Sequence, residues 1–437
     1  MNTPVKEMQT AAAPATSSSP NRLRSLQSLG IFCGFAAGAW LGGAEAPIKL
    51  VNPDISPITV SLIMVCGVFL ARWSVPAFVR GTSHVRNDVR QAPHLVVWAI
   101  LAGCMWAVAN TLTVYAIRNV GLSIAFPLWN SNSLLGILWG VLLFKELHYA
   151  GWKRWLGVLG GAICMFAGAT LLAIASSQQA APGKATLGVL AALGAGILWG
   201  TMYIPYRKAY LTGMNPLSFV TFFTIGELAT MTILALGYRG RIPLWHELIS
   251  ARDVLFWLML GGFVWVIGDL FQQYATKYVG ISRGIPLSNT NQLWGLMWGI
   301  LVFHELHGAH GSVYAQVAGG SFLMALGAVA IALSSATDRE HSSWQDAAER
   351  EGRRYRIESE YVSAGLEGRA YGNYETRRTL LDWFLIIGTT GLFVTLAVVA
   401  RFPHVSLNLS WAVALTAALL ALLGTCGLVL WRTTRFR

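Results

Sequence analysis

Amides and carboxylates occur inside apolar segments of this sequence, where polar side chains are costly unless paired or hydrated. They concentrate in two related stretches, residues 106–148 and 265–307, in which Asn110 and Asp269 occupy equivalent positions. Amides supply donors and acceptors together, and tryptophan rings offer flat apolar faces, so this set suits a neutral polyhydroxylated ligand. The candidate substrate-binding residues are Asn110, Trp129, Asn130, Asn132, Asp269, Gln273, Asn289, Asn291 and Gln292.

Asp269 is the candidate for proton coupling. A carboxylate deep in an apolar segment favours its neutral form and can therefore exchange a proton. The alternative is a structural acid, permanently protonated or bonded to an asparagine. For the asparagines, the alternative is a set of interhelical hydrogen bonds that only hold helices together.

Other acids in or near the apolar segments are weaker candidates. Glu45 lies beside Pro47 and is a candidate gate or mouth residue. Glu227 has no polar company in its segment, so we expect a structural role. Glu146 and Glu305 end equivalent segments, and we expect them to anchor helix ends at the membrane interface.

The composition predicts an all-α polytopic membrane protein. Apolar residues make up 54% of the chain and charged residues 12%, against roughly a quarter charged in soluble domains. Apolar stretches of about 20 residues recur, each long enough to cross a bilayer. The expected spans are 27–48, 57–78, 94–117, 121–144, 153–176, 186–207, 216–237, 254–278, 281–304, 313–335, 380–400 and 409–431.

Several function classes are disfavoured by what the sequence lacks. The net charge of +12 is not gathered into a basic stripe with interleaved aromatics, so we expect no nucleic-acid partner. The five cysteines form no CxxC pair, and no HExxH, phosphate-loop or GxGxxG motif is present. We therefore expect no metal, no cofactor and no enzymatic activity.

The two stretches belong to an internal duplication. They match without a gap from Trp106/Trp265 to His148/His307, and glycine rows match in the flanking spans. Each copy has five spans, and an odd number predicts inverted repeats. The last two spans have no counterpart, and we expect them to serve dimerisation or lipid contact. The expected organisation is 1–26 disordered cytoplasmic tail, 27–176 first repeat, 186–335 second repeat, 337–379 cytoplasmic linker and 380–431 appended transmembrane hairpin.

The distribution of positive charge predicts the orientation. With the N-terminus inside, 25 lysines and arginines, Arg72 among them, fall on the inner side and 7 on the outer side. Basic residues are enriched in cytoplasmic loops. We therefore expect a multi-pass protein of the inner or plasma membrane with both termini in the cytoplasm.

The repeated stretch resembles a known family. Its VG-(I/L)-S-x-x-x-P…N…G-x-x-x-G-x-x-x-F-x-E pattern is similar to that of the drug/metabolite transporter superfamily, and within it to the glucose/ribose porters of bacterial sugar uptake. The resemblance covers about residues 27–335 and implies ten helices, a central cavity and proton-driven sugar uptake. The matching residues are Gly121, Ser123, Pro127, Asn132, Gly136, Gly140, Glu146, Gly280, Ser282, Pro286, Asn291, Gln292, Gly299 and Glu305.

The resulting expectation is a secondary active transporter that moves a hexose, pentose or deoxyhexose together with protons by alternating access. One alternative is an exporter of drugs or metabolites from the same superfamily. Another, from a different class, is a membrane sensor or scaffold that binds a ligand without moving it.

Overall fold

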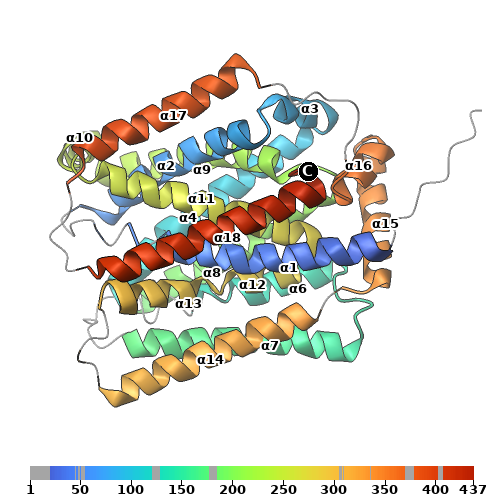
Figure 1. The fold of residues 1–437 in the computed structure, drawn as a ribbon, viewed down its shortest axis with the longest axis horizontal. Helices are drawn as coiled ribbons and strands as arrows, with labels where there is room; N and C mark the ends of the chain where they lie inside the picture. The colour runs from blue at the N-terminus through green and yellow to red at the C-terminus, as the bar shows by residue number, and fades with distance from the viewer. Residues whose placement is uncertain are drawn as a thin grey trace, which may run out of the picture.

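The computed structural model describes residues 20–44, 46–47, 50, 55–120, 128–176, 185–304, 308, 310–334, 336–369, 378–401 and 407–437. Every regular element within these ranges is a helix, and most of the helices lie roughly along one direction (Figure 1). Ten helices are long and apolar enough to cross a membrane. The predicted polytopic all-α fold is therefore confirmed.

The first half of the core contains five predicted spans and one short helix, α3. The predicted fourth span, 121–144, contains the short helix α6. Residues 121–127 of that range lie outside the described part of the chain. The predicted tail 1–26 also lies mostly outside, but α1 already begins at Pro20. The helices are α1 (Pro20–Gly43), α2 (Pro57–Val79), α3 (Ser83–Gln91), α4 (His94–Val120), α6 (Asn132–Phe144) and α7 (Gly151–Ser176).

The second half repeats this order with one interruption. The predicted span 281–304 is not one helix, because it breaks at Asn289 and Thr290. Pro286 cannot donate to the helix ladder, and the hydroxyls of Ser288 and Thr290 bond to the carbonyls of Ile285 and Leu287. The helices are α8 (Ala185–Leu211), α9 (Pro216–Arg239), α10 (Arg241–Ser250), α11 (Leu255–Val279), α12 (Ile281–Ser288), α13 (Asn291–Met297), the π-helix η2 (Trp298–Val302) and α14 (Gly311–Leu333).

The two halves pack through reciprocal pairs of helices. α4 packs on α8 and α9, and its counterpart α11 packs on α1 and α2. α7 and α14 lie side by side at one edge (Figure 1). There Gly161 lies against Gly327, and Gly168 lies against Gly320. Such an exchange of equivalent residues is the pattern of a two-fold axis, and it is compatible with inverted repeats.

The region after the repeats forms four more helices. The predicted linker contains α15 (Asp338–Arg354), whose Thr337 and Glu340 form a capping box, and α16 (Ser359–Leu366). The last two spans are α17 (Leu380–Val399) and α18 (Leu409–Thr434). They pack on different parts of the core, α17 on α2 and α11, and α18 on α1 and η2 (Figure 1).

Replacement of Gly168 by alanine should destabilise the protein by about 1–3 kcal/mol, because an added Cβ overpacks a close helix crossing. That Cβ would lie 2.6 Å from the backbone oxygen of Gly320. Thermal unfolding in detergent measures the effect. Gly160→Ala on the same helix is the control, since its Cβ would meet only Leu156 Cδ1 at 4.0 Å. Equal melting temperatures for the two variants would contradict the close crossing.

Candidate functional site

A cluster of three charged side chains lies in the middle of the bundle. Arg72 on α2 donates to Glu227 on α9 at 3.0 Å and to Asp269 on α11 at 2.7 Å. All three side chains are fully buried. The Arg72 guanidinium also lies over the rings of Phe223 and Trp265, at 4.1 and 5.3 Å from their centroids. The cluster therefore joins the first half of the chain to the second through one cation.

The charges in this cluster do not balance. One guanidinium faces two carboxylates, so the cluster carries a net negative charge if both acids are ionised. A buried net charge is costly in a low-dielectric interior, and a bound proton removes it. The arrangement can therefore hold one exchangeable proton between Glu227 and Asp269.

Amides and phenols extend this cluster toward α8. Gln273 donates to Asp269 Oδ1 at 3.0 Å, and Gln273 itself accepts from the Tyr210 hydroxyl. The neighbouring Gln272 donates to Tyr203 at 3.2 Å and to Ser288 Oγ at 2.6 Å. Since Ser288 ends α12, the bonds of Gln272 reach the break in the ninth span, and Gln272 is next in sequence to Gln273, which bonds to the carboxylate.

A second polar group occupies that break. Asn289 donates to Asn132 Oδ1 at 3.2 Å and to the hydroxyl of Ser133. These bonds connect the start of α6 in the first half to the end of α12 in the second. Asn132 belongs to the first half and Asn289 to the second, so the contact crosses between the halves. The two asparagines are not equivalent positions of the duplication.

Three buried polar atoms close in sequence to these two asparagines have no hydrogen-bond partner within the described residues. They are Asn130 Nδ2, Asn291 Oδ1 and Gln292 Oε1. Unsatisfied buried groups cost about 1–3 kcal/mol each and call for an explanation such as a bound ligand. Trp129 lies nearby in sequence and packs edge-on against Trp199, with 6.1 Å between ring centroids.

The structure thus gathers part of the predicted set. Asp269 and Gln273 share one network, and Asn132 and Asn289 share the other. Asn110 lies half-buried on α4, where the carbonyl accepts from Thr113, and no described side-chain contact joins it to either network. Glu45 lies outside the described residues.

Arg72 is not among the predicted site residues, and counting it with the charges on the inner side is wrong. Arg72 lies within α2, seven residues before its end at Val79. The signal was available, because an arginine inside an apolar span needs an acidic partner, and Glu227 and Asp269 both lacked a cation. Without Arg72, 24 basic residues remain on the expected inner side against 7 outside.

The expectation that Glu146 anchors a helix end at the membrane interface is also wrong. Its side chain is fully buried, pairs with Arg207 at 2.9 Å and accepts from the backbone N–H groups of Ile281 and Ser282 at 3.2 and 2.9 Å. A carboxylate at the start of α12 is favourable for the helix dipole. Glu146 thus caps a helix of the other half, while Glu305 lies outside the described residues.

The linker helix α15 contributes to the same end of the bundle. Its Trp344 lies under the Arg207 guanidinium at 4.4 Å, and its Glu340 pairs with Arg283 at 3.2 Å. Glu340 also accepts from the backbone N–H of Leu147 at 2.8 Å. These contacts close the bundle at the end where α6 finishes and α12 begins.

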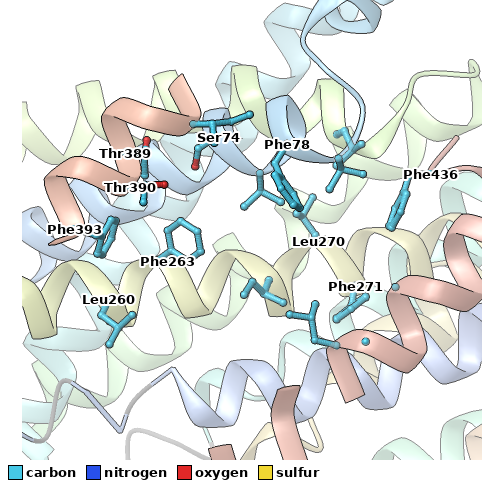
Figure 2. A pocket seen from close by; sticks show the side chains of 18 of the residues that line it. Ser74, Phe78, Leu260, Phe263, Leu270, Phe271, Thr389, Thr390, Phe393 and Phe436 are labelled. Carbon is cyan, nitrogen blue, oxygen red and sulfur yellow. The ribbon is translucent and has the colours of Figure 1, made fainter. Parts of the chain in front are cut away.

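The polar networks are separate from a cavity of about 980 Å³ between α17, α18 and the core. Figure 2 shows its lining, which includes Phe263 and Phe393, with hydroxyls from Ser74, Thr389 and Thr390. None of the predicted site residues is part of the described lining. This apolar space does not fit a polyhydroxylated ligand.

Replacement of Arg72 by methionine should destabilise the protein by about 3–5 kcal/mol, because two buried carboxylates lose their cation. Combining it with Glu227→Gln and Asp269→Asn should recover most of that loss, since no uncompensated charge remains. Thermal unfolding of the single and triple variants measures both effects. A triple variant no more stable than Arg72→Met would contradict this account of the cluster.

Comparison with known proteins finds similarity to sugar-uptake sequences. A family model described as sugar transport protein matches residues 190–355. Transmembrane protein 144 homolog B of Dictyostelium discoideum is 30% identical over 33% of this chain and 40% of its own length. The putative sugar uptake protein lin0215 of Listeria innocua is 22% identical over 54% of this chain and 78% of its own. A putative sugar uptake protein of Streptococcus pyogenes is 40% identical over 15% of this chain and 23% of its own. The chain therefore resembles the sugar-uptake porters, most clearly in the second repeat.

Proposed function

We propose that this protein is a secondary active transporter that takes up a sugar, coupled to protons, by alternating access. The observation that carries the proposal is the buried cluster in which Arg72 of one half holds Glu227 and Asp269 of the other. Transporters built from repeats bind substrate and coupling ions near the midplane, between the repeats and at broken helices. The likeness to proteins named as sugar uptake proteins supports a sugar as the substrate.

The proposed sugar site lies at the break in the ninth span. The unpartnered atoms of Asn130, Asn291 and Gln292 supply an N–H donor and two carbonyl acceptors there. Sugar hydroxyls donate and accept, so they can satisfy all three. They can also replace the bonds from Asn289 to Asn132 and Ser133, which connect the two halves. Trp129 offers the adjacent ring face.

The proposed coupling uses the imbalance of charge around Arg72. A proton on Asp269 weakens its bond to Arg72 and so loosens a contact between the halves. Gln273 and Gln272 link this change to Ser288 and the adjacent sugar site. Proton binding and sugar binding thereby act on the same interface between α2, α6, α11 and α12.

The proposed conformation is closed toward the linker. The contacts of α15 with Arg207 and Arg283 seal that end. At the other end, a cavity of about 50 Å³ is lined by residues of α2, α4 and α9, including Ser61, Thr111 and Met231. With the linker in the cytoplasm, as the charge distribution favours, this narrow space lies on the proposed outer side.

Replacement of Asp269 by asparagine should abolish uphill sugar accumulation driven by a proton gradient but leave counterflow exchange, because the amide keeps the shape of the site without the exchangeable proton. Flux into proteoliposomes with labelled hexoses, pentoses and deoxyhexoses, with and without the gradient, measures this. Asp346→Asn, an exposed acid on α15, is the matched control. Unimpaired accumulation by Asp269→Asn would remove the proposed coupling role.

The same flux assay separates the other functions. Gradient-driven efflux of drugs or metabolites, with no sugar uptake, would identify an exporter. Saturable sugar binding without flux would identify a sensor or scaffold.

Replacement of Asn289 by alanine should raise the half-saturation concentration for sugar about 3- to 10-fold, since a neutral hydrogen bond contributes about 0.5–1.5 kcal/mol. The maximal rate should change less. The control is Asn119→Ala, because Asn119 bonds only to the carbonyl of Tyr115 in its own helix. An unchanged half-saturation concentration in Asn289→Ala would place the sugar elsewhere.

A further inference from the structure

A second polar cavity lies at the linker end of the bundle, apart from the proposed sugar site. Its volume is about 80 Å³. The walls come from the end of α2, from α3, from the loop between α8 and α9, from the last turn of α11, from α16 and the residue Arg369 after it, and from the residues after α18. Parts of the chain that are far apart in sequence therefore meet around one small space.

The charges that line this cavity are predominantly positive. Four cations, Arg80, Lys277, Arg369 and Arg437, are in its described lining, and Asp88 is the carboxylate there. Arg369 is already paired with Glu367 at 2.5 Å, which leaves three cations. Asp88 already accepts from the Tyr361 hydroxyl at 3.0 Å and from the backbone N–H of Asn215 at 3.3 Å. Burial raises the pKa of Asp88, which further limits its ability to neutralise three cations.

Lys277 gives the strongest evidence for an anion site in this cavity. Its side chain is 4% exposed, and its Nζ has no hydrogen-bond partner within the described residues. The aromatic ring beside it, that of Tyr278, is 5.6 Å away. An ammonium group buried without a partner costs several kcal/mol. An anion in the cavity would remove that cost.

His84 adds a neutral hydrogen-bond acceptor to these cations. Its Nδ1 bonds to the carbonyl of Gly81, and its Nε2 is buried without a partner within the described residues. Burial, reinforced by the charge of Arg80, lowers the pKa of His84 to about 3. The ring is therefore neutral near pH 7, and with a proton on Nδ1 its Nε2 accepts a hydrogen bond.

We propose that this cavity binds a phosphoryl group. The charged oxygens of the phosphoryl group accept hydrogen bonds from Lys277, Arg80 and Arg437, and its P–OH group donates to His84 Nε2. About 10–15 Å³ of such volume holds one water molecule, so the cavity has room for one tetrahedral oxyanion. The group comes either from a soluble phosphate compound or from the headgroup of a membrane lipid. This site is separate from the proposed sugar site.

Occupation of the cavity ties the linker and the C-terminal segment to the core. Tyr361 belongs to α16, and Arg80 donates to the carbonyl of Phe436 at 3.2 Å. Asn215 and Tyr274 donate to the same carbonyl at 2.8 and 3.1 Å. A bound phosphoryl group therefore favours the conformation in which this end of the bundle is closed.

The test measures thermal unfolding of the full-length protein in neutral detergent as inorganic phosphate is titrated. Phosphate should raise the melting temperature saturably, because a ligand that binds only the folded state stabilises it. Lys277→Met should bind phosphate at least about tenfold more weakly, since it loses a charge-assisted hydrogen bond. Without phosphate, this variant should melt no lower than the wild type, because an unpaired buried charge has been removed. Lys153→Met, an exposed lysine on α7, should behave as the wild type.

Two further measurements, one with sulfate and one in nanodiscs, identify the ligand and its source. Sulfate has no O–H to donate to His84 near pH 7, so it should bind more weakly than phosphate. If stabilisation appears only in nanodiscs that contain phosphatidic acid, and depends on Lys277, the group is a lipid headgroup. An equal response to phosphate in Lys277→Met and wild type, or none to either source, would overturn the proposal.

Discussion

One cation shared by two acids in the middle of the bundle is the constraint on which the rest of the structure depends. Arg72 can remain buried only because Glu227 and Asp269 accept from it, at 3.0 and 2.7 Å. The acids come from α9 and α11 and the cation from α2, so neither half can satisfy its charges alone. Electrostatics thus holds the two halves in register at the depth where lipid offers no alternative partner.

Packing between the halves depends on glycine for a different reason. Helices in lipid gain little from hydrophobic burial against one another, so close backbone contact supplies the attraction. Gly161 and Gly168 of α7 meet Gly327 and Gly320 of α14 in reciprocal fashion. The same two-fold logic pairs α4 with α8 and α11 with α1.

The region after the repeats packs against one end of the core. α15 places Glu340 and Trp344 against Arg283 and Arg207, which are themselves buried. α18 ends where the Phe436 carbonyl collects donors from α2, α9 and α11. The linker and the residues after the last helix therefore contact the same end of the bundle, whereas α17 lies beside the apolar cavity whose lining Figure 2 shows.

The sequence by itself determined the helical membrane fold, the duplication and most helix positions, because hydropathy and internal matches are local signals. It also identified Asp269 and the asparagines, since polar groups in apolar spans are conspicuous. Only the tertiary structure decided their partners. Arg72 looked like a loop charge and Glu146 like an interface anchor until distant helices were brought together. The break at Asn289 likewise depends on Pro286 and on hydroxyls that bond to the backbone, a competition that hydropathy does not register.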